Sequence, residues 1–169
     1  MSAPGTASEA PRGIWRRRVG EPVVALLAEG LTPDRLALGL AGGFVLGLFP
    51  IIGATTVLCV LAGYAFRLNH VALQLGNHLV YPLQLPLILA FVRLGEGLLR
   101  APHVTFDPLA LVRHFQRDAV GFLREFSLTG LHGILGWALV APPVLLVLYL
   151  ALRPPLRRLD GALRAPRGS

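Results

Sequence analysis

The sequence contains no lysine, a single cysteine and few charged residues for its length. Charged residues make up 15% of its 169 positions, whereas a soluble domain contains about 25%. Cys59 lies alone in an apolar stretch, which excludes a disulfide framework and a paired-thiol metal site. So few charges cannot coat a water-soluble globule of this size, and the composition therefore argues against a soluble protein.

The charges that are present are kept out of three long apolar stretches. No Asp, Glu or Arg occurs in Leu36–Phe66, Leu68–Val92 or Phe126–Leu152. About 20 apolar residues in a helix cross the hydrocarbon core of a bilayer. The sequence therefore predicts an all-α integral membrane protein, and its length favours a single domain over two.

All sixteen basic residues are arginine, and they concentrate near the two ends of the chain. The net charge of +7 raises the question of nucleic acid. However, positive flanks also hold the ends of a membrane protein in the cytoplasm and attract anionic lipid. With both termini inside, eleven arginines lie on the cytoplasmic side and five on the other. We therefore expect a multi-pass membrane protein with both termini cytoplasmic, with the lipid bilayer as its partner and without nucleic acid.

The pattern divides the chain into three regions. These are a mobile basic tail at 1–30, one helical membrane domain at 31–152 and a basic tail at 153–169. A short apolar stretch at 23–28 predicts a turn of interfacial helix within the first tail. The membrane domain is expected to contain four segments: a broken hairpin at 36–66, a kinked span at 68–99, an amphipathic helix at 107–126 and a last span at 127–152.

The hairpin is predicted from a break in the middle of its apolar stretch. Thr32 and Pro33 are a cap and a first helical residue, but one helix over 33–66 would be about 50 Å long. The hydrocarbon core is only about 30 Å thick. Pro50 and Gly53 break the segment into helices at about 33–49 and 55–67, the second capped by Thr55 or Thr56. The two arms form either a re-entrant hairpin, which their length favours, or two short spans.

Glycines recur every four residues along the first arm, at Gly39, Gly43 and Gly47. This spacing puts them on one stripe of a helix, and such stripes let membrane helices approach closely. We therefore expect the stripe to pack within the hairpin or against a second copy in a homo-oligomer. The alternative is a role in a solute path.

Polar residues gather on one face of the next predicted helix: His70, Gln74, Asn77, His78, Tyr81 and Gln84. At about 100° per residue they cover a face roughly 120° wide. Polar groups in a span are costly to expose to lipid, so this polar stripe should face other helices or water. Pro82 and Pro86 each remove a helix hydrogen bond and free a carbonyl beside it. The stripe is thus either a lined path or binding site, or interhelical hydrogen-bond glue.

The last third of the chain combines an amphipathic segment with a final apolar one. Asp107 and Pro108 predict the start of an interfacial amphipathic helix over 107–126. The last span is expected to kink at Pro142 and Pro143 and to end at the arginines that begin with Arg153.

A set of short motifs lies between residues 32 and 96. They are Thr-Pro at 32–33, LALGLAGGF at 36–44, LFPIIGATT at 48–56, RLN at 67–69, YPLQ at 81–84 and RLGE at 93–96. Together they resemble the bacterial inner-membrane proteins grouped as the domain of unknown function numbered two-zero-six-two. Many members have asparagine where this chain has Tyr81. The resemblance implies location in the bacterial inner membrane, and it implies no reaction or ligand.

The remaining polar residues do not form an enzyme site. No spacing couples a nucleophile to a base, and Glu96 beside Arg93 and Arg100 is interpreted as an interfacial ion cluster. We therefore expect a protein that is not an enzyme and has no metal or cofactor. Two Gly- and Pro-interrupted apolar segments favour a small protein that translocates or binds a solute or ion of unknown identity. The alternative is a non-catalytic scaffold that docks a partner enzyme or organises lipid.

Overall fold

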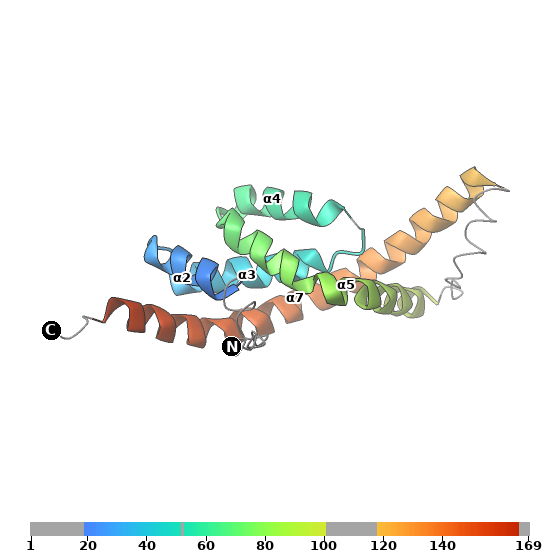
Figure 1. The fold of residues 1–169 in the computed structure, drawn as a ribbon. Coiled ribbons are helices and arrows are strands. Elements are labelled where there is room, and N and C mark those ends of the chain that lie inside the picture. The colour runs from blue at the N-terminus through green and yellow to red at the C-terminus, as the bar shows by residue number, and fades with distance from the viewer. Residues whose placement is uncertain (1–18, 52, 101–117, 166–169) are drawn as a thin grey trace, which may run out of the picture.

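The computed structural model describes residues 19–51, 53–100 and 118–165, and all regular secondary structure in them is helical. The predicted all-α fold is therefore confirmed for these residues. In chain order, the helices are α2 (Glu21–Ala28), α3 (Pro33–Gly47), α4 (Ala54–Phe66), α5 (His70–Leu99) and α7 (Ala119–Arg164) (Figure 1).

Helices α3 and α4 are the two arms of a hairpin (Figure 1). Thr32 caps α3 as expected, and its Oγ1 accepts a hydrogen bond from the backbone N–H of Arg35 at 3.4 Å. The expected threonine cap of α4 is wrong. Gly53 occupies the cap position instead, with φ 90°, and no side chain caps the helix. Glycine adopts this left-handed backbone without steric penalty, so a sharp turn replaces a side-chain cap.

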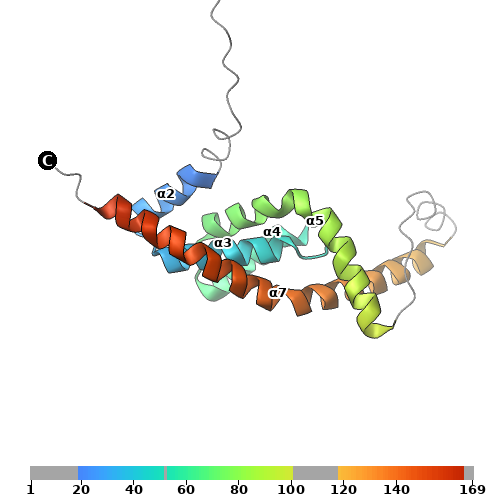
Figure 2. The same ribbon diagram turned by 90° about the horizontal axis from the view of Figure 1, so that it is seen from below.

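Helix α5 is longer and more continuous than its two prolines suggest. Asn69 caps its start by accepting a hydrogen bond from the N–H of Ala72 at 3.0 Å. Pro82 and Pro86 lie inside the helix, which changes direction near its middle (Figure 2). A proline removes one helix hydrogen bond and pushes on the preceding turn. The prolines therefore bend α5 without ending it.

Helix α7 runs without interruption over 46 residues and contains all four prolines of the region, at 142, 143, 154 and 155. It joins the end of the expected amphipathic helix, at 119–126, directly to the expected last span, while 107–117 lie outside the described residues. The helix also does not end at 152. Residues 153–164 continue it because Leu156 is buried in the core and two arginines of this turn pair with α3.

Helix α3 lies at the centre of the bundle, with contacts to each of the other described helices. At one end, α2, the start of α3 and Leu156 of α7 share an apolar core that also contains Ala72. At the other end, Leu48, Val80 and Phe91 form a second core, against which Trp137 packs. The segment at 23–28 is thus part of a helix that packs on the bundle through Val23, Leu26 and Leu27.

The expected glycine stripe of Gly39, Gly43 and Gly47 packs against α5. A Cβ added to any of the three would lie 2.8 Å or less from an atom of α5. At Gly43 the added Cβ would overlap the backbone carbonyl of Leu73. A Cβ added to Gly76 of α5 would likewise overlap a backbone carbonyl of α3. The stripe therefore joins α3 to the helix after the hairpin, and α5 already covers the face that a second copy would need.

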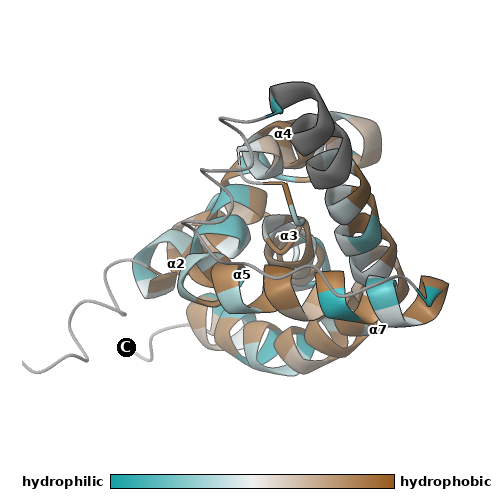
Figure 3. Cartoon of the chain, turned by 90° about the vertical axis from the view of Figure 1, so that its right-hand side faces the viewer, coloured by the Kyte–Doolittle hydropathy of each residue, from teal (hydrophilic) through white to brown (hydrophobic). Residues whose placement is uncertain are grey.

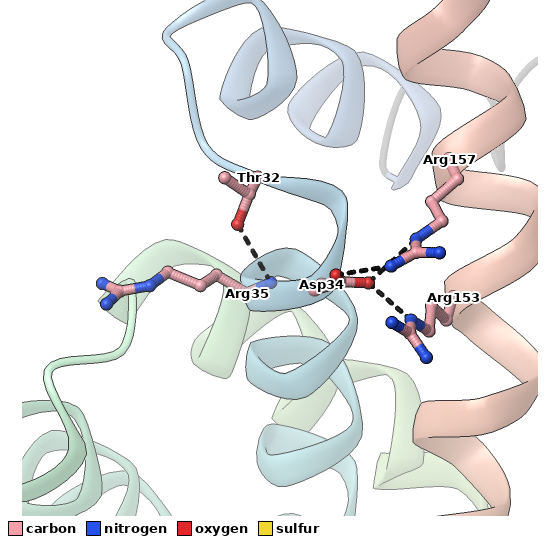
Figure 4. Close-up of polar contacts among 5 residues, drawn as sticks. All are labelled: Thr32, Asp34, Arg35, Arg153 and Arg157. Atoms are coloured by element: carbon pink, nitrogen blue, oxygen red, sulfur yellow. Dashed lines mark hydrogen bonds and ion pairs between the residues drawn. The ribbon is translucent and has the colours of Figure 1, made fainter.

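One acidic residue ties the start of α3 to the far end of the chain (Figure 4). Arg153 donates through Nε to Asp34 Oδ1 at 2.7 Å, and Arg157 donates through Nη2 to Oδ2 at 2.8 Å. Hydrogen bonds from Arg157 and Arg153 to the charged carboxylate lower the pKa of Asp34 from 3.8 to about 2. The contact therefore depends on an ionised Asp34.

Acidification is expected to weaken this contact between pH of about 4 and about 2. Because the folded-state pKa of Asp34 is lower than the unfolded one, its stabilisation is complete above the unfolded value and is lost as pH falls through the folded value. The measurement is the melting temperature of detergent-purified wild type and Asp34→Asn across this range. The difference between the two proteins should shrink as the pH falls; a constant difference would contradict the assignment.

Large apolar side chains are exposed along α4, α5 and α7, among them Leu61, Leu85 and Leu146, and apolar segments, drawn in brown, recur along the helices in Figure 3. Within the described residues, two helices are long and apolar enough to cross a membrane: His70–Leu99 and Ser127–Arg164. Within the most apolar window of each, 33% of the first and only 6% of the second is buried. The core helix of a soluble protein would be mostly buried, so these helices turn their apolar residues outward instead.

Candidate functional site

The structure divides the polar stripe of α5 between two environments. Four of its six residues line one groove together with Pro82: His70, Gln74, His78 and Tyr81. Asn77 points the other way and is fully buried. Gln84 is half-buried, one turn beyond Tyr81, and does not line the groove.

The groove lies between α5 and the start of α2. It has a volume of about 920 Å³, which lies within the range of about 300–1,000 Å³ that is typical of small-molecule sites. Val19 and Pro22 come from the α2 side, and the apolar residues of α5 that complete the lining are Val71, Leu75, Leu79 and Pro82. The groove is thus mainly apolar, with a row of polar groups from α5 along it.

Hydrogen bonds within α5 position these polar groups. The Nδ1 of His78 lies 2.6 Å from the carbonyl oxygen of Gln74, which fits an Nδ1–H donor. The ring of His78 also packs against Tyr81, with 5.0 Å between ring centroids. The amide oxygen of Gln74 accepts from Asn77 Nδ2 at 3.3 Å. The groove therefore offers hydrogen-bond donors and acceptors in fixed positions.

His70 closes one end of the polar row. Its ring packs edge-on against Tyr64 of α4, with 4.9 Å between centroids. The same ring fills the space over Gly63, where an added Cβ would lie 2.5 Å from Nδ1. The ring of His70 therefore packs against α4, and these contacts hold α4 against the start of α5.

Asn77 lies at the interface between α5 and α3. Its Oδ1 is buried and has no hydrogen-bond partner among the described residues. The same oxygen would lie 2.7 Å from a Cβ added to Gly47, close to the C-terminal end of α3. Among the described residues, the amide nitrogen donates to Gln74, on the same helix. Asn77 thus supports the groove from behind by holding Gln74, and it does not open into the groove.

The predicted helix breaks have different roles. Pro50 at the hairpin tip packs on α7, where a Cβ added to Gly133 would lie 3.2 Å from its Cβ. Next to it, Phe49 stacks edge-on against Trp137 with 5.1 Å between centroids. Gly53 supplies the turn into α4, and Pro82 lines the groove. Pro86 lies within α5, one turn further on.

Sequence reasoning missed the second wall of the groove. Val19 and Pro22 fall in the region expected to be a tail, and no local pattern indicates that α2 folds back on α5. The helical spacing of Val23, Leu26 and Leu27 indicates that α2 packs on the bundle, but it does not indicate that α5 lies across the groove from it.

A second polar cluster lies where α5 meets α7. The carboxylate of Glu96 is fully buried, and Arg93 donates to it at 2.9 Å. Next to it, Gly95 packs on the backbone carbonyl of His132, whose Nδ1 is buried. In the parts of the chain that the structure describes, no group of three or more His, Cys, Asp or Glu residues is arranged to hold a metal ion.

A model of one protein family matches residues 16–162, which is most of the chain. The family is described as uncharacterized proteins conserved in bacteria, DUF2062. The chain belongs to this family. The match confirms the resemblance inferred from the motifs at 32–96, and it covers α7 of this DUF2062 protein up to residue 162. No curated protein and no solved structure matches the chain.

Membership of DUF2062 assigns no activity, so function has to be argued from the site itself. In this DUF2062 chain the groove collects most of the polar stripe, one of the helix-bending prolines and a wall from α2. It is therefore the candidate binding site.

Proposed function

We propose that this protein is a non-catalytic, multi-pass protein of the bacterial inner membrane that binds an amphiphilic solute in the groove between α2 and α5. The observation that carries the proposal is the composition of the groove. Four polar residues of one helix face are brought together in an otherwise apolar cavity of about 920 Å³. A ligand with an apolar body and one polar head group that can form hydrogen bonds matches this lining.

Residence in the membrane is supported by where the apolar residues lie. Leu146, Val147 and Leu150 of α7 are each more than half exposed, in a stretch without charge. In water such a surface would be an aggregation hazard, whereas lipid is its natural solvent. The membrane therefore explains a helix whose apolar window is only 6% buried.

A re-entrant hairpin is supported by the lengths of its arms. Helices α3 and α4 have 15 and 13 residues, or about 22 and 20 Å, which is less than a hydrocarbon core of about 30 Å. Beyond the hairpin tip, α5 and α7 continue to pack on each other at Gly95 and His132. In this arrangement α3 enters and α4 leaves on the same side of the membrane.

Charge supports a cytoplasmic location for the base of the hairpin. Arg35 and Arg67 flank the hairpin arms, and Arg153, Arg157 and Arg158 follow the last apolar run. The contacts of Asp34 with α7 bring these segments to one end of the bundle. The positive-inside rule places that end in the cytoplasm. Since α2 and the start of α5 lie there too, the groove is near the cytoplasmic surface.

The proposal is tested by photocrosslinking in phosphatidylcholine vesicles. The two probes are palmitic acid and hexadecane, each carrying a diazirine on the chain. Leu79→Trp fills the groove, and Leu139→Trp is the matched control, because Leu139 is 56% exposed on α7 and lies outside the groove. We expect saturable labelling of α5 by the acid probe, reduced about tenfold by Leu79→Trp and unchanged by the control. His78→Leu should remove the preference for the acid probe over the alkane.

Labelling of α5 that rises linearly with probe and equals that of α7 would contradict the binding proposal. That result would favour the scaffold alternative, which one observation supports: Asn77 and the glycine stripe are buried where α5 packs on α3. Under the scaffold alternative, Leu79→Trp and Leu139→Trp would behave alike with both probes.

A further inference from the structure

The two arginines of α7 that pair with Asp34, Arg153 and Arg157, do not line the groove and form a separate polar site. Asp34 accepts from both side chains and offsets one of their two positive charges. The side chains of Arg153 and Arg157 remain 38% and 52% exposed. A net positive charge is therefore held at a fixed, solvent-accessible position on the bundle.

Most of the hydrogen-bond donors of this pair are unused. Arg153 bonds to Asp34 through Nε alone, so its two terminal amino groups have no hydrogen-bond partner among the described residues. Arg157 uses Nε and Nη2, which leaves Nη1. A guanidinium has five N–H donors in a planar fork that matches the oxygens of a phosphate.

The two guanidinium groups are also held in place. They lie four residues apart on one face of α7, and a single carboxylate aligns both (Figure 4). The guanidinium of Arg153 lies 5.9 Å from the centre of the Tyr149 ring, one turn earlier. Arg35 points away from the pair (Figure 4). Little side-chain freedom remains to be lost when an anion binds.

The site lies where the last apolar run of α7 ends. Tyr149 precedes the pair, as aromatic residues often do at the membrane surface, and Leu156 between the two arginines is buried in the core. Given the membrane placement in the proposed function, this depth is that of lipid phosphates on the cytoplasmic side.

We propose that Arg153 and Arg157, aligned by Asp34, bind a phosphate group at the cytoplasmic membrane surface. Phosphate is the shared chemistry of an anionic phospholipid and of free inorganic phosphate. The apolar surroundings favour the lipid as the source. The site is separate from the groove, so it stands or falls independently of the amphiphile proposed there.

The test measures the melting temperature of the full-length protein in nanodiscs. Phosphatidylglycerol is titrated into a phosphatidylcholine background, and in a second arm inorganic phosphate is added to phosphatidylcholine nanodiscs alone. The main variant combines Asp34→Asn, Arg153→Gln and Arg157→Gln, which removes both guanidinium groups without leaving an unpaired carboxylate. The control is Arg164→Gln, which likewise lowers the net charge of the protein by one and leaves the pair intact.

Wild type should show a saturable rise in melting temperature with phosphatidylglycerol. The half-saturating fraction should increase about tenfold or more in the triple variant and less than about fivefold in the control. A rise with inorganic phosphate that the triple variant lacks would support the same site with a soluble source. No rise in wild type with either, or an equal rise in the triple variant, would overturn the proposal.

A second variant keeps the test decisive if the triple variant does not fold. Arg153→Lys with Arg157→Lys retains both charges and the pairing with Asp34 but removes the planar fork. We expect a several-fold loss of the phosphatidylglycerol response in this variant. An undiminished response would show that diffuse charge attracts the lipid and that no phosphate site exists.

Discussion

Gly43→Ala is expected to lower the melting temperature by roughly 6–12 °C, corresponding to about 3 kcal/mol, the upper end of what overpacking costs. The added Cβ would overlap the carbonyl oxygen of Leu73, which belongs to the backbone of α5 and cannot rotate away. The overlap can be relieved only if α3 and α5 move apart, and α3 contacts every other described helix of the bundle. The measurement is thermal unfolding of the purified protein in detergent.

Gly42→Ala is the control for this prediction, because the two glycines are neighbours on the same helix. A Cβ on Gly42 would lie 3.5 Å from Cδ2 of Leu73, an ordinary contact. Alanine is a better helix former than glycine by about 1 kcal/mol. Gly42→Ala should therefore be neutral or stabilising. Equal destabilisation by both substitutions would show that the close approach at Gly43 does not hold α3 on α5.

Trp137→Ala is expected to cost about 3 kcal/mol, the low end for truncating a tryptophan, because the ring is only half-buried. The indole N–H donates to the carbonyl oxygen of Val45 at 3.0 Å, and the ring packs edge-on against Phe49. Both contacts join α7 to the end of α3, so their loss frees the hairpin tip. Trp137→Phe keeps the ring contact and should lose about 1 kcal/mol.

The freed tip can be followed by thiol labelling. In a Cys59→Ala background, Ile51→Cys places a thiol at the tip, where Ile51 is 45% exposed. We expect Trp137→Ala to raise the rate of maleimide labelling at this position. Leu139→Ala, two residues further along α7 and outward-facing, should leave both stability and labelling unchanged. If Trp137→Ala and Leu139→Ala behave alike, the tip is not anchored by α7.

Local signals account for what could be predicted of the helices. Thr32 and Pro33 begin α3 through short-range effects. The threonine oxygen accepts a hydrogen bond from a free backbone N–H three residues later, and proline suits the first helical position because it has no N–H that needs a partner. The break at Pro50 and Gly53 is equally local. Proline lacks a backbone N–H, glycine adopts a left-handed backbone, and each of these properties interrupts the helix at that residue. A threonine cap is not needed at α4, because the left-handed backbone of Gly53 turns the chain into the helix without a side-chain hydrogen bond.

Local sequence patterns do not predict features that depend on contacts between segments far apart in the chain. The arginines from Arg153 onward predict the end of the last span, but the helix itself continues to Arg164, because Arg153 pairs with Asp34, 119 positions earlier in the chain. Likewise, the helical spacing of the polar stripe predicts one continuous polar face. The packing of α3 on α5 buries Asn77 and leaves its neighbours His78 and Tyr81 exposed, because α3 covers only part of the face.

The sequence by itself determined that the described chain is helical, where the hairpin breaks and to which family the protein belongs, because composition, caps and prolines act over a few residues. Only the tertiary structure decided which partner the glycine stripe has and which polar residues line the groove. It also decided that Arg153 and Arg157 share one carboxylate. These features depend on how helices far apart in sequence lie side by side, and no local pattern encodes that arrangement.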